Sequence, residues 1–316
     1  MDTELLRTPS YRFRDLPEFP YTPQYVDVSG AIDAVDCPGL TEALMGYVTA
    51  GSGKRTILCL HGEASWSFTY RKMIPILADA GRVIAPDYLG FGRSEKFARM
   101  DDHSFQLHRD TIAELVKVLD LQHITLVGHD WGGPFGLGVV MEHPDRFDQF
   151  VFLNSTLPDG RYPMSDTFMK WRKFAEETPD LSIGHLIEQG LAVNSDRGYI
   201  TDLSPEVLAA YEAPFPSPEY KAGPRQFPLM VPTPEHPSPA SNPIRRIEDR
   251  IPEFDKPAQM LFSKGDPIIP SGRIRLPELF SRTEEHVISN AGHFLQENAG
   301  KQVAKHIVRF INDPSV

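Results

Sequence analysis

One segment of the sequence carries residue types whose spacing could place a reactive side chain at a strained turn. Within residues 124–143, an apolar strand-like stretch leads into a turn in which Gly128 and Gly132 flank Asp130, and a helix-like stretch follows. This is the form of a nucleophile elbow, in which glycines let the backbone pass through a strained conformation close to its neighbours. An aspartate that merely caps the next helix would need no flanking glycines. The sequence therefore predicts Asp130 as a nucleophile.

Two later residues occupy the places where an elbow nucleophile finds its partners. In this arrangement an acid follows a later strand and a histidine lies near the C-terminus, and Asp266 and His293 meet these two conditions. The histidine would take a proton from water while the acid orients its ring. We expect Asp130, Asp266 and His293 to form a catalytic triad. The other histidines stand in motif turns or in helix and loop contexts that suit surface or packing roles.

The elements that must position these residues alternate between strand-like and helix-like patterns. We predict strands at residues 43–51, 56–62, 82–90, 124–130, 150–156, 257–265 and 284–290. Helical patterns cover residues 105–119, 271–280 and 293–312. This alternation predicts an α/β protein with a mostly parallel sheet that helices cover on both faces.

Residues 158–240 interrupt the alternation. Helical patterns at 165–177, 181–190 and 204–212 are followed by a stretch so rich in proline that we expect an extended path there, not a helix or a central strand. We interpret residues 158–240 as an inserted helical cap domain. Residues 1–157 and 241–316 would then form the core domain.

The composition restricts the partners and the compartment. The 316 residues are 41% hydrophobic and carry a formal net charge of −11, which disfavours nucleic acid and anionic membranes as partners. The apolar runs are too short for a membrane span and the first residues lack the pattern of a secretory signal, so we expect a cytoplasmic protein. Cys37 and Cys59 provide neither a disulfide framework nor a zinc site, and Cys59 fits a buried thiol.

The motifs around the triad resemble those of haloalkane dehalogenases, a family of α/β-hydrolases, over nearly the whole chain. Residues 61–75, which begin His-Gly-Glu, and residues 87–94 are similar to family segments that follow two neighbouring strands, and residues 213–223 resemble the family's lid. The most specific part is Trp131, next to the nucleophile, combined with Glu63. The resemblance implies the α/β-hydrolase fold: a mostly parallel eight-stranded sheet flanked by helices, with an inserted helical cap.

The resemblance also implies which residues supply the acid and bind the halide. Family members carry the acid after the sixth or the seventh strand, and Asn154 at the first of these positions has no charge, so Asp266 at the second is the expected acid. Members bind halide with either an asparagine after the His-Gly pair or a lid tryptophan. Because Glu63 follows that pair, we expect Trp131 and Trp171 to donate their indole N–H groups to the halide. The alternative for Trp171 is ordinary packing in a lid helix.

A carboxylate at the elbow implies a reaction in two steps. Asp130 would displace halide from a saturated carbon and form an alkyl ester, which water activated by His293 would then hydrolyse at the Asp130 carboxyl carbon. We expect the backbone N–H groups of Glu63 and Trp131 to hold the oxyanion. The implied partners are a small apolar halogenated substrate and a halide ion. No cofactor and no metal are implied, and we expect a monomer.

The resemblance suggests lid residues that line the substrate pocket and shows two departures from the family pattern. The candidate wall residues are Phe168, Phe227, Pro228 and Val231. Ala64 replaces the proline that usually follows the His-Gly-Glu triplet, and Pro134 stands where some relatives carry an aromatic residue. We expect the first departure to affect only loop stiffness and the second to widen or reshape the cavity.

Two other functions fit part of the same pattern. An epoxide hydrolase shares the nucleophile, base and acid but opens its ring with lid tyrosine hydroxyls, for which Tyr162, Tyr199, Tyr211 and Tyr220 are available. Tyr211 and Tyr220, however, lie in the segment that resembles dehalogenases. A non-catalytic ligand-binding protein could use the same fold, but the chain retains every triad member. We therefore favour a haloalkane dehalogenase.

Overall fold

An eight-stranded sheet forms the centre of the computed structural model, which describes residues 5–32, 37, 39–191, 203–269 and 275–313. The strand order is β10-β9-β8-β7-β4-β5-β3-β2. β3 runs antiparallel to both of its neighbours, and all other neighbouring strands are parallel. The strands of this sheet are β2 (Gln24–Asp27), β3 (Leu44–Ala50), β4 (Thr56–Leu60), β5 (Arg82–Pro86), β7 (Ile124–His129), β8 (Phe147–Leu153), β9 (Ala258–Ser263) and β10 (Thr283–Ile288).

Each strand predicted from the sequence is present, with some differences at the ends. β5 stops at Pro86 because Asp87 leaves the strand and accepts hydrogen bonds from the backbone N–H groups of Ser67 and Arg93. No pattern in the sequence indicated β2, which spans four residues and buries only Val26. A stretch this short offers too little alternation to be found by pattern.

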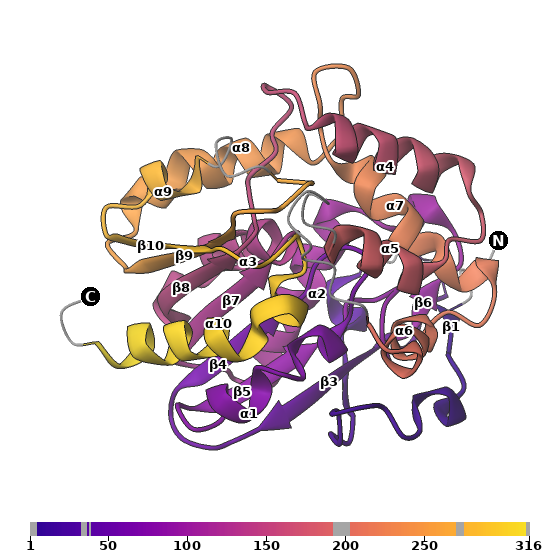
Figure 1. Cartoon of the computed structure of the whole chain (residues 1–316), viewed down its shortest axis with the longest axis horizontal. Coiled ribbons are helices and arrows are strands. Elements are labelled where there is room, and N and C mark those ends of the chain that lie inside the picture. Colours follow the sequence, from indigo (N-terminus) through magenta and orange to yellow (C-terminus); the bar gives the residue numbers. More distant parts are fainter. Residues whose placement is uncertain (1–4, 33–36, 38, 192–202, 270–274, 314–316) are drawn as a thin grey trace.

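Helices cover both faces of this sheet (Figure 1). On one face α1 (Ile74–Leu77) packs beside α10 (Leu295–Asn312). On the other, α3 (Gly132–Glu142) packs between α2 (Phe105–Val118) and α8 (Ser241–Arg250), and the short α9 (Leu276–Leu279) precedes β10. Strands β4, β7 and β9 are buried along their whole length. The predicted α/β fold with a mostly parallel, doubly covered sheet is confirmed.

Four further helices gather beyond the carboxyl ends of the parallel strands, toward the right and top of Figure 1. These cap helices are α4 (Asp166–Glu177), α5 (Ile183–Leu191), α6 (Pro205–Glu212) and α7 (Ala222–Met230). The first three match predicted helical patterns, but the expectation of an extended path through the proline-rich stretch was wrong for α7. Pro224 lies in the first turn of α7, where a backbone N–H has no partner within the helix. Arg172 Nη1 donates to the carbonyl of Pro228, nearer the end of α7, at 2.7 Å.

The N-terminal segment connects the core to the cap. Its first strand, β1 (Leu5–Leu6), forms a separate antiparallel pair with β6 (Lys96–Phe97). Arg12 in this segment donates through Nε to the carbonyl of Ala213, directly after α6, at 2.7 Å. A residue of the N-terminal segment, outside the cap, therefore binds the C-terminal end of α6.

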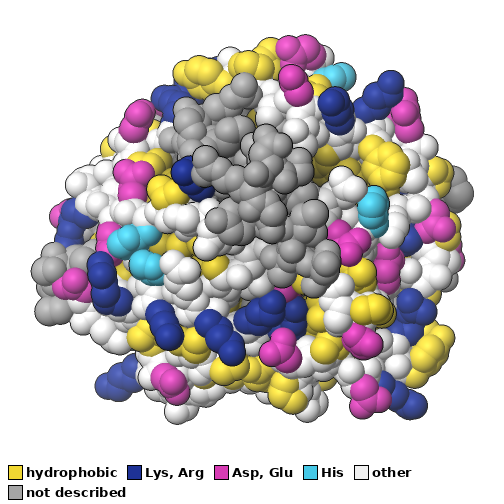
Figure 2. All heavy atoms as spheres, in the orientation of Figure 1, with side chains coloured by type: hydrophobic (Ala, Val, Ile, Leu, Met, Phe, Trp, Pro, Cys, Tyr) yellow, Lys and Arg dark blue, Asp and Glu magenta, His cyan; other side chains and the backbone are white. Residues whose placement is uncertain are grey.

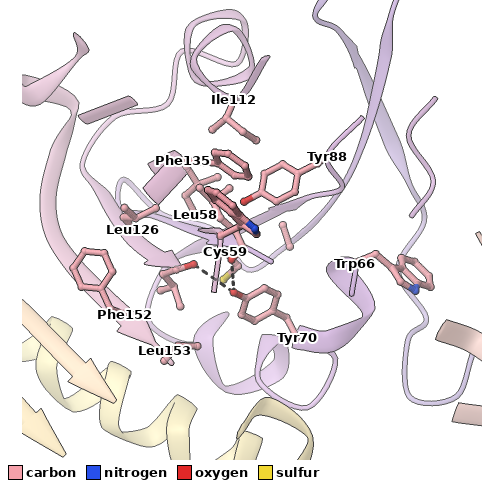
Figure 3. Packing of buried hydrophobic residues seen from close by; sticks show 14 of the residues in the cluster. Leu58, Cys59, Trp66, Tyr70, Tyr88, Ile112, Leu126, Phe135, Phe152 and Leu153 are labelled. Atoms are coloured by element: carbon pink, nitrogen blue, oxygen red, sulfur yellow. Dashed lines mark hydrogen bonds between the residues drawn. The ribbon is translucent and has the colours of Figure 1, made fainter. Parts of the chain in front are cut away.

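Aromatic and aliphatic side chains fill the space between the sheet and its helices (Figure 3). Cys59 lies in this core beside Leu58 and is fully buried, and burial raises the pKa of its thiol. The prediction of a buried thiol is confirmed for Cys59. Tyr70 reaches into the same region and donates its hydroxyl to the carbonyl of Leu60 at 2.8 Å.

Charge is spread over the surface. Figure 2 shows basic and acidic side chains distributed over one face, with apolar and uncharged groups between them. Among the helices that the structure describes, none is both long enough and apolar enough to cross a membrane.

Candidate active site

Asp130 lies at the sharp turn between β7 and α3, with a φ of +50° in the left-handed region. Close packing explains the glycines around it. A Cβ on Gly132 would lie 2.2 Å from the carbonyl oxygen of Leu60, and one on Gly128 would lie 2.7 Å from the backbone of Gly132. Ser155 Oγ donates to the carbonyl of Asp130 at 2.7 Å. The backbone of the turn is therefore fixed by the core, as a nucleophile elbow requires.

Backbone donors face the Asp130 carboxylate. The N–H of Glu63 donates to Asp130 Oδ1 at 2.8 Å, and the backbone of Trp131 also hydrogen-bonds the carboxylate. Glycine precedes Glu63 because a Cβ on Gly62 would lie 2.4 Å from the Cβ of Asp130. These two N–H groups lie where an oxyanion formed on the Asp130 carboxyl carbon would need donors.

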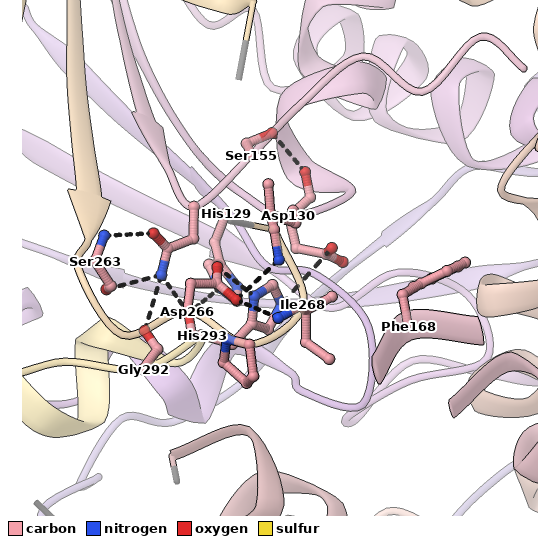
Figure 4. A network of polar contacts seen from close by, with 12 residues as sticks. His129, Asp130, Ser155, Phe168, Ser263, Asp266, Ile268, Gly292 and His293 are labelled. Carbon is pink, nitrogen blue, oxygen red and sulfur yellow. Dashed lines mark hydrogen bonds and ion pairs between the residues drawn. The ribbon is translucent and has the colours of Figure 1, made fainter. Parts of the chain in front are cut away.

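His293 lies between two carboxylates (Figure 4). Its Nδ1 is 3.0 Å from Asp266 Oδ2, and its Nε2 is 3.7 Å from Asp130 Oδ2. The other oxygen of Asp266 accepts hydrogen bonds from the backbone N–H groups of Ile268 and Ile269, at 2.8 and 3.0 Å. The structure thus brings the three predicted triad residues together, with the acid fixed by the loop after β9.

Asn154, just after β8, ties together the segments around the base. Its Nδ2 donates to the carbonyls of Gly292 and His293 at 2.9 and 2.8 Å. Its side chain also bonds Ser263, with Nδ2 donating to Oγ at 2.9 Å and Oδ1 accepting from the backbone N–H at 2.8 Å. His129 Nε2 lies 3.0 Å from the same His293 carbonyl. The sequence indicated only that Asn154 is uncharged. No local pattern could have shown its hydrogen bonds to Ser263, Gly292 and His293, which are distant in sequence.

A cavity of about 530 Å³ lies between the triad and the cap helices. Asp130, His293, Trp131 and Trp171 line it, together with Phe168, Pro228 and Val231. The prediction that Phe227 lines this cavity was wrong. Phe227 is fully buried and packs against Trp131 and Phe91, with ring centroids 6.1 and 4.5 Å apart. Successive residues of a helix point about 100° apart, so Pro228 faces the cavity and Phe227 supports the wall from behind.

Comparisons with known proteins agree with this geometry. A family profile described as the alpha/beta hydrolase fold matches residues 55–299. The haloalkane dehalogenases of Psychrobacter cryohalolentis and Mycobacterium marinum are 41% and 37% identical to the chain, and the matches cover 98% and 96% of it and 99% of each relative. The chain belongs to the haloalkane dehalogenase family.

A solved haloalkane dehalogenase supports the same conclusion. The structure of DpaA from Paraglaciecola agarilytica NO2 superposes with a TM-score of 0.83 at 35% identity, covering 96% of this chain and 97% of that one. The chain is therefore a hydrolase that acts on carbon–halide bonds, with a haloalkane as substrate and halide as a product. DpaA is described as tetrameric, so the expectation of a monomer finds no support here.

The two tryptophans expected to bind halide come from different parts of this dehalogenase. Trp131 follows the nucleophile, is 3% exposed, and stacks on Phe135 with ring centroids 5.1 Å apart and planes 13° apart. Trp171 belongs to cap helix α4, is only partly buried, and has Phe174 as a neighbour with centroids 6.2 Å apart. One indole is therefore fixed in the core and the other is carried by the cap.

Burial and neighbouring charges shift the pKa values of Asp130 and His293, the predicted nucleophile and base. Burial raises the pKa of Asp130, although the charge of His293 and the backbone donors oppose the shift. Burial alone would lower the pKa of His293, but the charge and hydrogen bond of Asp266 and the charge of Asp130 outweigh it, so the pKa is raised. Each neighbouring negative charge stabilises the protonated ring.

The side chain of Glu63 also lines the cavity, although the sequence suggested a role only for its backbone. The residue is 8% exposed, and neither carboxyl oxygen has a hydrogen-bond partner among the described residues. Burial, and then the charge of Asp130, raise the pKa of this carboxyl group well above its ordinary value. Both contributions favour the neutral form of this carboxyl group beside Asp130.

The two departures from the family pattern have different consequences. Ala64 has a φ of +57°, which the ring of a proline cannot adopt. The expectation that Ala64 affects only loop stiffness was therefore wrong, since the backbone beside Glu63 takes a path closed to proline. Pro134 lines a small cavity that also borders Asp130 and Trp131, so this position shapes the space next to the nucleophile.

Proposed function

We propose that dehalogenation in this chain uses Asp130 as nucleophile, His293 as general base and Asp266 as the acid that orients it. The observation that carries the proposal is the His293 ring, 3.0 Å from Asp266 and 3.7 Å from Asp130, at the edge of a largely apolar cavity. Residues 158–240 act as a cap domain over a core of residues 1–157 and 241–316. We place the chain in the subgroup of family members that carry the acid after the seventh strand, here β9, and that have a lid tryptophan.

The first step is a displacement at the halogen-bearing carbon. A bond forms between a carboxylate oxygen of Asp130 and that carbon, while the carbon–halogen bond breaks and its electron pair leaves with the halide. Removing a halide from water is unfavourable in an apolar cavity. The indole N–H groups of Trp131 and Trp171 offset this cost by donating hydrogen bonds to the developing anion.

The second step hydrolyses the ester. His293 Nε2 takes a proton from water, and the oxygen of that water attacks the carboxyl carbon of Asp130. The backbone N–H groups of Glu63 and Trp131 hold the oxyanion until the alcohol leaves and the carboxylate is restored. The separation of 3.7 Å between Nε2 and Asp130 Oδ2 exceeds a hydrogen bond, so the lone pair of the neutral ring is available to water.

The two steps are linked by the charge of Asp130. This charge contributes to the raised pKa of His293, and it disappears when the carboxylate becomes an ester. Alkylation therefore lowers the pKa of the ring and favours the neutral form just when a base is needed. Asp266 keeps its charge throughout and stabilises the imidazolium that forms.

The contacts of the lid tyrosines disfavour epoxide opening. In the described part of the chain no tyrosine lines the cavity. Tyr211 donates its hydroxyl to Glu297 at 2.5 Å, and the hydroxyl of Tyr162 accepts a hydrogen bond from Arg275 at 3.2 Å. Tyr199 lies outside the described residues. The retained triad geometry and the family's activity argue against a non-catalytic binding protein.

Isotope labelling tests the proposed roles. The purified protein is given a bromoalkane in water enriched in oxygen-18, and bromide release is followed. After many turnovers the label should appear in the side chain of Asp130, because water attacks its carboxyl carbon. The alcohol from a single turnover should contain unlabelled oxygen from the enzyme. Bromide release with direct labelling of that first alcohol would reject the covalent mechanism.

A further inference from the structure

The loop that carries His293 packs directly against the C-terminal end of cap helix α5. The backbone N–H of His293 donates to the carbonyl of Gly190 at 2.8 Å. Two glycines allow this close approach, since a Cβ on Gly292 would lie 2.5 Å from the Gly190 oxygen and a Cβ on Gly190 would lie 2.5 Å from the ring of Phe294. A helix-end carbonyl of the cap thus finds its partner in the backbone of the general base.

A second contact joins α10, the helix that follows this loop, to cap helix α6. Glu297, in the first turn of α10, is 2% exposed and accepts a hydrogen bond from the hydroxyl of Tyr211, on α6, at 2.5 Å. Arg71 in the core forms a two-pronged ion pair with the same carboxylate, with Nη2 2.7 Å from Oε2. Lys72 Nζ donates to the backbone carbonyl of Glu297 at 2.8 Å.

Core residues pair the charge of this buried carboxylate, and the cap adds one further hydrogen bond to it. A buried ion pair is favourable only if its remaining hydrogen-bonding positions are filled. Burial alone would raise the pKa of Glu297, but the hydrogen bond and charge of Arg71, with smaller contributions from Lys72 and Tyr211, outweigh it and lower the pKa. The carboxylate is therefore charged, and Tyr211 supplies the hydrogen bond that comes from the cap.

The two cap helices act together. α5 and α6 pack against each other, and Glu212 at the end of α6 accepts a hydrogen bond from the backbone N–H of Gly184 in α5 at 3.0 Å. The pair meets the loop at His293 itself, through the carbonyl of Gly190, and meets the first turn of α10 at Glu297, through Tyr211. A shift of either helix would therefore be transmitted to the loop.

We propose that Tyr211 and Glu297 are positioning residues for the general base, through which α5 and α6 hold His293 in line with Asp266 for hydrolysis of the ester. This proposal rests on the proposed function, in which the base acts only in the second step. Displacement of halide needs no base, so its rate should not depend on the contacts of Tyr211 with Glu297. Tyr211 and Glu297 touch neither the substrate nor the reacting atoms.

Tyr211→Phe is the test, because it removes one hydroxyl and keeps the ring and the Arg71–Glu297 ion pair. Tyr47→Phe is the matched control, because it also removes one tyrosine hydroxyl and its hydrogen bond, to Gln24 Oε1 at 2.8 Å, but lies between strands β3 and β2, away from the cap. Rapid mixing with a bromoalkane would measure the bromide burst, and mass spectrometry of quenched samples would measure decay of the ester on Asp130. Thermal unfolding would report the stability of each variant.

We expect Tyr211→Phe to keep the burst rate within about twofold and to slow ester decay about tenfold, since a small misplacement of a catalytic group has effects of this order or larger. Tyr47→Phe should lower the melting temperature without changing the ratio of the two rates. Equal ratios in Tyr211→Phe and wild type would overturn the proposal and leave Tyr211 as a structural contact. Many turnovers of the wild-type protein in oxygen-18 water without label in Asp130 would instead overturn the proposed function.

Discussion

The proposed nucleophile and the proposed base are held by different parts of the molecule. Asp130 is fixed within the core, by its left-handed backbone, the close-packed glycines around it and the hydroxyl of Ser155. His293 is held from the core through Asn154 and from the cap through the carbonyl of Gly190. Formation of the ester should therefore depend mainly on the core. Hydrolysis of the ester should depend on the core and the cap together.

The largest expected effect comes from the core, with Asp130→Asn. Asparagine tolerates the left-handed turn, but its amide is a poor nucleophile, so initial bromide release should fall by about a thousandfold or more. Bromide should be assayed at once on protein whose mass has been verified, because slow deamidation would restore the carboxylate. Full activity in a fresh sample would exclude Asp130 as the nucleophile. It would also contradict the view that ester formation depends on the core through Asp130.

His293→Gln should separate the two steps. Alkylation needs no base and hydrolysis does, so the variant should release about one equivalent of bromide per site and then stop. Steady-state turnover should fall by about 10² to 10⁴-fold, the usual contribution of a general base. Intact-mass measurement should find the trapped ester. Continued turnover at the wild-type rate would contradict the division of labour between the steps.

Trp171→Phe tests the contribution of the cap to the first step. The variant keeps an aromatic ring and loses the N–H, and a hydrogen bond to a charged group contributes about 1.5 to 3 kcal/mol, which corresponds to roughly tenfold to a hundredfold. Bromide affinity, followed by quenching of tryptophan fluorescence, and the rate of dehalogenation should both fall by that factor.

Trp66→Phe is a matched control for Trp171→Phe. Trp66 donates its indole N–H to the carbonyl of Ala210 at 3.2 Å and does not line the cavity, so its loss should leave bromide affinity unchanged. If Trp171→Phe bound bromide as tightly as wild type, Trp171 would be ordinary packing. The cap would then contribute to the second step only.

The smallest expected effect is a change in the pH dependence of stability in Glu63→Gln. The pKa of Glu63 is raised in the folded state, so the stability gained from its protonated form is complete below the ordinary value of 4.5 and declines as the pH rises toward the folded-state value. Glutamine cannot ionise, and the variant should lose less stability than wild type between about pH 5 and 8. Melting temperatures at the two pH values measure this, at about 2–4 °C per kcal/mol. If the melting temperatures of wild type and Glu63→Gln changed equally between the two pH values, Glu63 would not be buried as the structure describes.

Sequence patterns were informative wherever a role depends on local backbone geometry. The elbow around Asp130 needs flanking glycines within a few residues, and Asp266 and His293 follow the predicted strands β9 and β10, so short patterns and chain order are enough to find them. The strand pattern likewise located most of the sheet. β2 was missed because it spans only four residues, of which Val26 alone is buried.

Patterns failed where a role depends on which side chains meet across the fold. Asn154 and Gly292 are 138 positions apart in sequence, and Tyr211 and Glu297 are 86 apart, so no local signal connects them. Phe227 and Pro228 are neighbours in sequence, but only the second faces the cavity, because the rotation of α7 against α4 is set by packing. The same packing stabilises α7 in a stretch where the prolines favoured an extended chain.

The contact between Gly190 and Gly292 limits how freely the cap could be exchanged among relatives. An inserted segment is often treated as a module that carries specificity and leaves the chemistry untouched. Here a transplanted cap with any side chain at position 190 would press on Phe294, and one with a shifted α5 would remove the acceptor from the backbone of His293. Chimaeras of this enzyme should therefore take α5 and the loop that carries His293 from the same parent, with both Gly190 and Gly292.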